Sequence, residues 1–312
     1  MSSFRGKILV IRGGAIGDFI LTLPAISALR TQFPDAFLEV LGYPHIVQLA
    51  QAGKVVDRVQ SIEARALAGF FARNGTLEED LRDYFSEFDL IISYLYDPDE
   101  IFKTNLARCT TAQFIAGPHR PTESGRIHAT QVFLKPLESL AIFDADPVPR
   151  LSLGATANSK RPLALHPGSG SESKNWPEEK WAELLQHLIA ETPFKLLLVG
   201  GEAEGERLQD LAATLPPTRL TVAQSLPLVE LGRMLERSCA FIGHDSGISH
   251  LAAALGLPGL VLWGDTVEGI WRPPSEKVKI VRNAGKLTDL SVAEVMSALD
   301  RLIEDQRIKH AI

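Results

Sequence analysis

Short apolar runs alternate with longer segments of helical periodicity along most of the chain. The first run covers residues 8–11 and is followed by a turn containing glycines and by a helical pattern over residues 19–30. Strands that alternate with helices are typical of a parallel sheet covered by helices. The same pattern predicts further strands in the first half of the chain at residues 37–41, 90–94 and 113–116.

The alternation is interrupted between residues 146 and 162, where prolines, glycine and small polar residues follow one another without periodicity. Such a composition is typical of a linker, and 312 residues suffice for two hydrophobic cores. We therefore predict an N-terminal Rossmann-like domain over residues 1–155 and a C-terminal one over residues 156–312. Strands of the second domain are expected at residues 163–165, 195–199, 220–222, 240–242 and 260–263.

Composition and charge exclude several classes of protein. Hydrophobic residues make up 45% of the chain, which is too much for a disordered protein. The 32 basic residues are outnumbered by 38 acidic ones, so no nucleic-acid partner is expected. No apolar stretch approaches the length of about 18 residues that a membrane span requires, and the first residues lack a signal-peptide core. We expect a cytoplasmic protein whose Cys109 and Cys239 are reduced, buried thiols.

Ligands of open parallel sheets bind beyond the carboxyl ends of the strands, so the turns there are the candidate sites. In the first turn, Gly14 and Gly17 have the spacing of the last two glycines of a dinucleotide fingerprint, but Arg12 replaces the first. Asp18 has two interpretations: a helix N-cap, or a carboxylate in the interdomain cleft that takes a proton from an attacking hydroxyl. Glu39 lies at the distance of a ribose-binding acid, but the apolar run around it predicts a place within a strand.

The second turn, residues 166–174, combines small residues and serines with Lys174 and precedes a helix that starts at Pro177. Exposed backbone N–H groups, hydroxyls, a point charge and a helix N-terminus together suit a diphosphate. The alternative is a flexible surface loop. After the next strand, Glu202 follows two glycines and could accept hydrogen bonds from ribose hydroxyls, or could simply be an acid near a helix start.

The fourth turn places Asp245, Ser246, Gly247 and His250 at the start of a helix. Asp245 and Ser246 suit a helix cap, and glycine at position 247 permits close approach of a ligand to the backbone. For His250, the alternatives are a ligand contact and an ordinary core or surface histidine.

Three of these segments, residues 11–30, 166–181 and 245–258, together resemble the bacterial lipopolysaccharide heptosyltransferases of glycosyltransferase family 9, and their order and spacing match from near residue 7 to near residue 270. The resemblance implies the GT-B architecture, in which two Rossmann-like domains with parallel sheets face each other across an interdomain cleft. It also implies an inverting transfer of a sugar from a nucleotide diphosphate donor, typically ADP-heptose, to a hydroxyl of a glycolipid or other glycan acceptor.

The resemblance further implies a role for each matching residue. Asp18 matches the general base, Lys174 the residue that holds the donor phosphates, and Glu202 the ribose-binding acid. The remaining donor-binding positions implied by the family are Ser169, Gly170, Asp245, Ser246, Gly247 and His250. The residues contain no His, Cys or carboxylate cluster with metal-ligand spacing, so we predict catalysis without a metal or another cofactor, with Lys174 stabilising the leaving diphosphate.

The segment at residues 64–88 affects the expected acceptor and the expected location. It carries five acids, whereas the family's lipopolysaccharide acceptors are anionic, so a different acceptor is one interpretation. Phe70 and Phe71, which lie between Arg65 and Arg73, could contact the inner face of the inner membrane as a peripheral anchor. Burial against the sheet is the interpretation that we favour.

The sequence leaves three other functions to consider. A protein of the same fold could bind or sense a nucleotide sugar without transferring it, although binding alone does not require Asp18. A nicotinamide-dependent dehydrogenase is disfavoured by Arg12 in the fingerprint. The carboxylates of residues 97–100 could indicate glycoside hydrolysis, but neighbours around a proline favour a turn.

Overall fold

The computed structural model describes residues 4–155, 161–202 and 204–305. The chain forms two compact units, Met1–Pro147 and Val148–Ile312. The division lies at the start of the segment rich in proline and glycine, eight residues before the boundary predicted from the sequence. Each unit is an α/β domain with its own parallel sheet.

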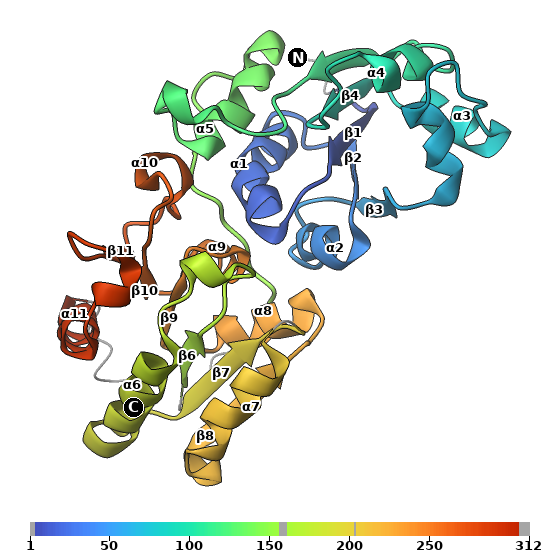
Figure 1. The fold of residues 1–312 in the computed structure, drawn as a ribbon. Coiled ribbons are helices and arrows are strands. Elements are labelled where there is room, and N and C mark those ends of the chain that lie inside the picture. Colours follow the sequence, from blue (N-terminus) through green and yellow to red (C-terminus); the bar gives the residue numbers. More distant parts are fainter. Residues whose placement is uncertain (1–3, 156–160, 203, 306–312) are drawn as a thin grey trace. The chain divides into compact units, whose positions relative to one another are not determined.

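Unit 1 contains a five-stranded parallel sheet in the order β3-β2-β1-β4-β5 (Figure 1). Its strands are β1 (Lys7–Arg12), β2 (Phe37–Gly42), β3 (Arg58–Ser61), β4 (Leu90–Ser93) and β5 (Gln113–Ala116). In the central register, Ile8 pairs with Leu38 on one side and with Leu90 on the other. The continuous apolar runs predicted from the sequence are therefore confirmed as strands. The short edge strand β3 was missed because its residues are alternately exposed and half-buried, so it contains no continuous apolar run.

The helices of unit 1 are α1 (Ile16–Gln32), α2 (Pro44–Ala52), α3 (Glu79–Ser86), α4 (Ile101–Leu106) and α5 (Ala129–Leu134), with 3-10 turns η1 (Arg65–Phe71), η2 (Glu123–Gly125) and η3 (Lys135–Leu140). Figure 1 shows α1 and α5 on one side of the sheet and α3 and α4 on the other. Phe70 is fully buried among aromatic rings of α3 and α4, as the burial interpretation predicted. Phe71 is 46% exposed and stacks on Phe102.

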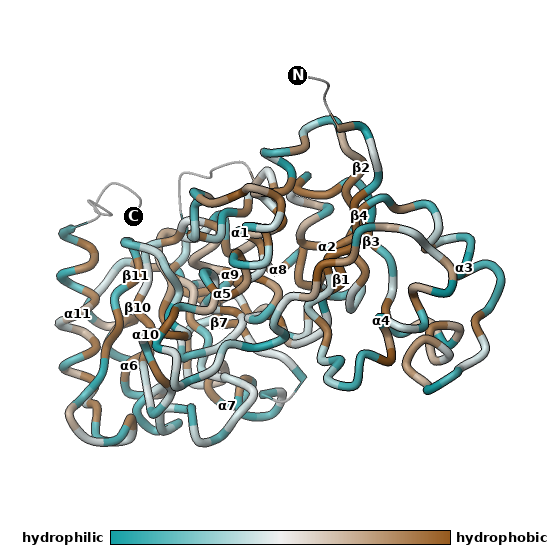
Figure 2. The backbone as a smooth tube through the Cα atoms, turned by 90° about the horizontal axis from the view of Figure 1, so that it is seen from above, coloured by the Kyte–Doolittle hydropathy of each residue, from teal (hydrophilic) through white to brown (hydrophobic). Residues whose placement is uncertain are grey.

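Unit 2 contains a six-stranded parallel sheet in the order β11-β10-β9-β6-β7-β8. Its strands are β6 (Leu163–His166), β7 (Leu196–Gly200), β8 (Leu220–Gln224), β9 (Ala240–His244), β10 (Gly259–Leu262) and β11 (Val278–Val281). Every residue of β6, β7, β9 and β10 is buried, as expected for a parallel sheet covered on both faces. In Figure 2 the hydrophobic colouring is strongest around β1 and β4, inner strands of the sheet of unit 1. The predicted strands are confirmed, and only the edge strand β11 was missed.

The helices of unit 2 are α6 (Glu178–Glu191), α7 (Gly205–Ala213), α8 (Leu228–Glu236), α9 (Gly247–Ala254), α10 (Glu268–Trp271) and α11 (Val292–Asp305), with 3-10 turns η4 (Glu172–Lys174), η5 (Pro217–Arg219) and η6 (Leu287–Asp289). Helices α6 and α11 pack against each other and contribute Trp181 and Leu299 to the apolar core of unit 2. Among the described helices, none is long and apolar enough to cross a bilayer.

The strand orders fix where ligands can bind. In unit 1 the chain runs outward from β1 through β2 to β3 and then continues on the other side at β4; in unit 2 it does the same from β6 to β9. At such a switch point, the connections that leave two neighbouring strands run in opposite directions and open a crevice at the carboxyl ends. The turns after β1 and β4, and those after β6 and β9, are therefore the candidate ligand positions.

Candidate functional site

An ion pair joins the two turns at the switch point of unit 2. The Nζ atom of Lys174 lies 2.7 Å from Oδ2 of Asp245, the residue after β9. Thr266 Oγ1 donates a hydrogen bond of 2.6 Å to the same Oδ2 atom. The Asp245 side chain is almost fully buried, whereas Lys174 is about one-third exposed, at 36%. The arrangement holds the Lys174 ammonium at the carboxyl end of the sheet, where Asp245 balances its charge and part of the side chain stays exposed. Thr266 was not identified from the sequence.

The N-terminus of α9 lies beside this ion pair. Ser246 is its N-cap, and the Ser246 hydroxyl accepts a hydrogen bond from the backbone N–H of Ser249, as the capping interpretation predicted. Gly247 is the first residue of the helix and His250, one turn further on, is buried. The start of an α-helix carries unpaired N–H groups and a partial positive charge. The helix start thus presents N–H donors beside the Lys174 ammonium, the kind of group to which an anion binds.

The loop between β6 and α6 carries the other predicted phosphate contacts. The Ser169 hydroxyl lies 2.8 Å from the Ser171 carbonyl and 2.7 Å from Asn175 Oδ1, so it is engaged within the loop. Gly170 has a φ of +73°, which side chains other than glycine disfavour, and the space where its Cβ would lie is open. The backbone at Gly170 is therefore accessible to a ligand.

His244, which sequence reasoning did not single out, connects the two ends of this loop. Its Nε2 atom accepts a hydrogen bond of 2.9 Å from the backbone N–H of Trp176, and its Nδ1 atom lies 3.3 Å from the carbonyl oxygen of Gly168. This pattern requires a neutral ring with the proton on Nδ1. Burial, with a smaller contribution from His166, lowers the pKa of His244 to about 3. A buried, uncharged imidazole thus positions the loop that contains Ser169 and Gly170.

The two buried histidines of unit 2 predict a pH dependence of stability. Burial lowers the pKa of His166 to about 4 and that of His244 to about 3, below the value of about 6.5 expected in the unfolded chain. At pH values between the folded and unfolded pKa of each histidine, that histidine binds a proton in the unfolded state but not in the folded state. The free energy of unfolding should therefore be constant above about pH 7 and fall with decreasing pH, by up to about 1.4 kcal/mol per pH unit for each group.

Tryptophan fluorescence measures this effect directly, because all four tryptophans lie in unit 2 and Trp176 and Trp181 contact His244. Urea titrations between pH 4 and pH 8 give the dependence. The variant His244→Gln should have a shallower dependence, and His187→Gln, on the exposed surface of α6, should behave like the wild type. A wild-type stability that does not change between pH 7 and pH 4 would contradict the prediction.

Glu202 and Glu204 take different positions after β7. The Glu204 carboxylate accepts a hydrogen bond of 2.8 Å from the backbone N–H of Gly201, and a Cβ atom on Gly168 would collide with it. Glu202 is exposed at the same turn. Glu204 therefore stabilises the contact between two turns, while the ribose-binding role of Glu202 stays a prediction.

In unit 1, Asp18 lies at the carboxyl end of β1. Helix α1 begins after Ala15, so the interpretation of Asp18 as the N-cap is wrong: Asp18 is the third residue of the helix, and its Oδ2 atom accepts a hydrogen bond of 3.0 Å from the Ala15 N–H. Gly14, with a φ of +101°, leaves room for the carboxylate, since a Cβ there would lie 3.0 Å from Oδ2. The side chain is 28% exposed, so the carboxylate is held at the helix start and remains accessible.

Arg12, which occupies the place of the first fingerprint glycine, is buried beneath Asp18. Its Nη2 atom lies 3.6 Å from Asp18 Oδ1, and its Nη1 atom donates hydrogen bonds to the carbonyl oxygens of His119 (2.8 Å) and Tyr94 (3.4 Å). The guanidinium stacks over the ring of Phe133. Burial lowers its pKa, and the charge of Asp18 opposes that change. Arg12 thus links Asp18 to the chain segments that follow β4 and β5.

The acids that suggested other functions have structural roles. Glu39 is fully buried within β2, as predicted, where it pairs with Arg58 of β3 at 2.7 Å and accepts a hydrogen bond of 2.9 Å from the Tyr84 hydroxyl. The Asp97 carboxylate accepts hydrogen bonds from the backbone N–H groups of Phe102 and Lys103. The interpretation of residues 97–100 as a turn is thereby confirmed.

The cysteines are free thiols. Cys239 is buried and Cys109 is half-buried, so the prediction of buried thiols is fully met only by Cys239. Burial raises the pKa of both, for Cys239 to about 11, which leaves them as unreactive thiols at neutral pH. Within the described ranges, no group of three or more His, Cys, Asp and Glu side chains could hold a metal ion.

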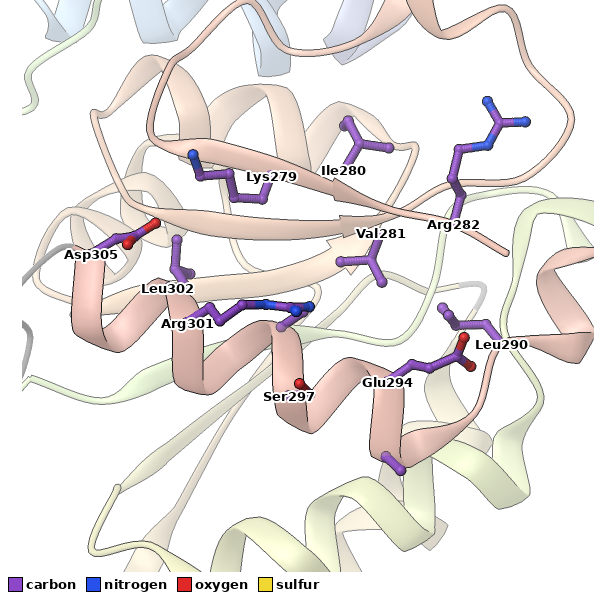
Figure 3. A pocket seen from close by; sticks show the side chains of 12 residues that line it. Lys279, Ile280, Val281, Arg282, Leu290, Glu294, Ser297, Arg301, Leu302 and Asp305 are labelled. Atoms are coloured by element: carbon purple, nitrogen blue, oxygen red, sulfur yellow. The ribbon is translucent and has the colours of Figure 1, made fainter. Parts of the chain in front are cut away.

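A separate hollow of about 740 Å³ lies beside the edge strand β11. Figure 3 shows Lys279 and Val281 of β11 opposite Ser297 and Arg301 of α11 across this hollow. None of the predicted site residues lines it. The switch points, and not this hollow, therefore hold the candidate chemistry.

Comparison with known proteins agrees with this geometry. Residues 141–297 match the model of Glycosyltransferase family 9 (heptosyltransferase). Lipopolysaccharide heptosyltransferase 1 of Pseudomonas aeruginosa is 37% identical over 295 residues, which cover 84% of this chain and 80% of that protein.

Solved structures give the same fold. The Escherichia coli ADP-heptose lps heptosyltransferase II has a TM-score of 0.78 at 19% identity, covering 96% of this chain and 99% of that one. An E. coli heptosyltransferase with ADP has a TM-score of 0.74 at 19% identity, covering 95% and 99%. These structures and this chain share the GT-B fold of two Rossmann-like domains with parallel sheets. The chain belongs to glycosyltransferase family 9, the heptosyltransferases.

Proposed function

We propose that the protein transfers heptose from ADP-heptose to a hydroxyl of a lipopolysaccharide-type or other glycan acceptor, with inversion at the anomeric carbon and without a metal ion. The observation that carries the proposal is the Lys174–Asp245 pair at the switch point of unit 2. ADP and ADP-heptose appear in the names of the E. coli heptosyltransferase structures, which supports this donor.

Unit 2 would bind the donor. Cleavage of the anomeric C–O bond leaves ADP, whose diphosphate gains negative charge in the transition state. Lys174 supplies a positive charge, and Asp245 and Thr266 keep it at the sheet edge. The proposed donor contacts are completed by the N-terminus of α9 with Ser246, Gly247 and His250, by the loop residues Ser169 and Gly170, and by Glu202 at the ribose. This arrangement stabilises the leaving group without a divalent cation.

Unit 1 would activate the acceptor. In this proposal, Asp18 removes the proton from the attacking hydroxyl as the oxygen forms a bond to the anomeric carbon and the bond to ADP breaks. A single displacement of this kind inverts the configuration. The hydrogen bond from Ala15 and the charge of Arg12 hold the Asp18 carboxylate in one position, which a general base requires. Of the two phenylalanines considered for a peripheral membrane contact, Phe70 is buried and only Phe71 is exposed.

The test is turnover of ADP-heptose with deacylated lipopolysaccharide from a strain that lacks core heptose. We expect release of ADP and an inverted anomeric configuration by NMR, at a rate that a chelator leaves unchanged. The variant Lys174→Ala should bind ADP at least about tenfold more weakly, because a charge-assisted hydrogen bond to phosphate contributes about 1.5–3 kcal/mol. Lys279→Ala, an exposed lysine of β11, is the matched control. Tight ADP-heptose binding without ADP release would instead support the nucleotide-sugar binding protein.

A further inference from the structure

The edge strand β11 of unit 2 leaves backbone groups unpaired. On one side, it receives hydrogen bonds from the chain of β10 at the carbonyl oxygens of Lys277 (3.1 Å) and Val281 (2.9 Å). The backbone groups of successive residues in a strand point alternately to its two sides. The Ile280 N–H and C=O groups therefore point away from β10, and within the described residues they have no hydrogen-bond partner. This side of β11 can pair with a further strand.

The hollow of about 740 Å³ lies beside β11, between this strand and α11. Val281, Leu290 and Leu302 give it apolar surface. Helix α11 forms the opposite wall, where Figure 3 shows Ser297 and Arg301 across from β11. A strand edge beside a helix, with apolar surface between them, is a geometry in which an extended peptide can add to a sheet.

The free charges of the hollow are mainly positive. Lys279 and Arg301 line it and are exposed, and neither forms an ion pair within the described part of the chain. The other charged residues of the lining are Arg282, Glu294 and Asp305. The Glu294 carboxylate is already engaged, because it accepts hydrogen bonds from the backbone and the side chain of Ser291. The hollow therefore favours an acidic ligand over a basic one.

We propose that β11 and α11 form a docking groove for an extended, acidic peptide segment of a partner protein. The backbone of the segment exchanges hydrogen bonds with the Ile280 N–H and C=O groups, and its acidic side chains meet Lys279 and Arg301. Charged side chains at the edge of a sheet also prevent unspecific pairing with other strands. The free edge thus requires an extended backbone, and the two cations require carboxylates on it. This docking is independent of heptose transfer.

Fluorescence polarisation with short labelled peptides tests the docking groove on the whole chain. The probe is a peptide with blocked ends in which Glu alternates with Val. One comparison peptide has Lys in place of Glu, and the other is the Glu peptide with N-methylated amides, which keeps the charge but removes the backbone donors. We expect the wild type to bind the Glu peptide, with an affinity that falls as salt is added, and to bind both comparison peptides at least tenfold more weakly.

Two variants test the two parts of the docking groove. Arg301→Glu should bind the Glu peptide at least about tenfold more weakly, the scale of one lost charge-assisted hydrogen bond. Arg237→Glu, at an exposed arginine after α8 that does not line the hollow, is the matched control and should bind like the wild type. Ile280→Pro removes the free N–H at a sheet edge, where proline is tolerated, and should also weaken binding. ADP affinity should be equal in all variants, since none of the predicted donor contacts lines the hollow.

The docking groove is overturned if the wild type does not bind the Glu peptide at millimolar concentration, if either comparison peptide binds equally well, or if Arg301→Glu binds like the wild type. Should Ile280→Pro not fold, the N-methylated peptide tests the same hydrogen bonds. Sedimentation equilibrium tests a second copy of the chain as the occupant. A dimeric wild type and a monomeric Arg301→Glu variant would show that the groove joins two copies, against the proposal.

Discussion

Replacing Asp18 with Asn should reduce the rate of heptose transfer at least about a hundredfold, the lower range for loss of a general base. The substitution preserves shape, because an Asn side-chain oxygen can still accept the hydrogen bond from the Ala15 N–H. It removes the negative charge and the capacity to take a proton. Since Asp18 belongs to unit 1 and the turns proposed to bind the donor belong to unit 2, ADP affinity should not change.

Turnover is measured as ADP release at saturating donor, and ADP affinity by calorimetry. Asp83→Asn, an exposed acid of α3, serves as the control for loss of one negative charge in unit 1. If Asp18→Asn retained more than a third of the wild-type rate, another group would have to accept the proton, and the proposed mechanism would be wrong.

The second large effect is expected from Arg12→Met, which keeps an unbranched apolar side chain but removes the guanidinium. The carbonyl oxygens of Tyr94 and His119 would lose a donor, and Asp18 would lose its buried positive partner. Removal of one member of a buried ion pair costs about 3–5 kcal/mol. We expect unit 1 to be destabilised by about 3 kcal/mol, the lower limit, because Asp18 is partly exposed. Transfer should slow as well, since Asp18 is no longer held in place.

The positions of the aromatic residues allow this effect to be assigned to one unit. The four tyrosines, Tyr43, Tyr84, Tyr94 and Tyr96, all lie in unit 1, and the four tryptophans, Trp176, Trp181, Trp263 and Trp271, all lie in unit 2. Urea unfolding followed by tyrosine circular dichroism should show the loss, and unfolding followed by tryptophan fluorescence should not. Arg12→Lys should fall between Met and the wild type, because an ammonium keeps the charge but not the fork of donors. An unchanged tyrosine transition in Arg12→Met would show that Arg12 contributes little.

The sequence predicts the central strands well, because a strand buried on both faces is a continuous apolar run. It fails at β3 and β11, which are short edge strands with charged or polar residues such as Arg58 and Lys279. Half-exposed edges carry a weaker hydrophobic signal than the sheet centre. Helix α11 carries a pronounced apolar stripe, which is the kind of pattern that periodicity detects.

Within the candidate site, single residues at strand ends could be predicted, but their partners could not. Arg12 reaches His119 over 107 positions of the sequence, and His244 receives the Trp176 N–H over 68. Such contacts depend on the strand order, which places β4 beside β1 and β9 beside β6. The replacement of a fingerprint glycine by Arg12 is the one local signal, and by itself it indicates only a departure from the dinucleotide-binding pattern.

The buried pairing of Glu39 with Arg58 and Tyr84 has a consequence for ligand binding by unit 1. At the corresponding point of a dinucleotide-binding domain, an acid accepts hydrogen bonds from a ribose. Here the Glu39 carboxylate links β2 to β3 and α3, because it pairs with Arg58 and accepts a hydrogen bond from the Tyr84 hydroxyl. A nucleotide that used Glu39 in that way would first have to break both contacts and separate the edge of the sheet from α3.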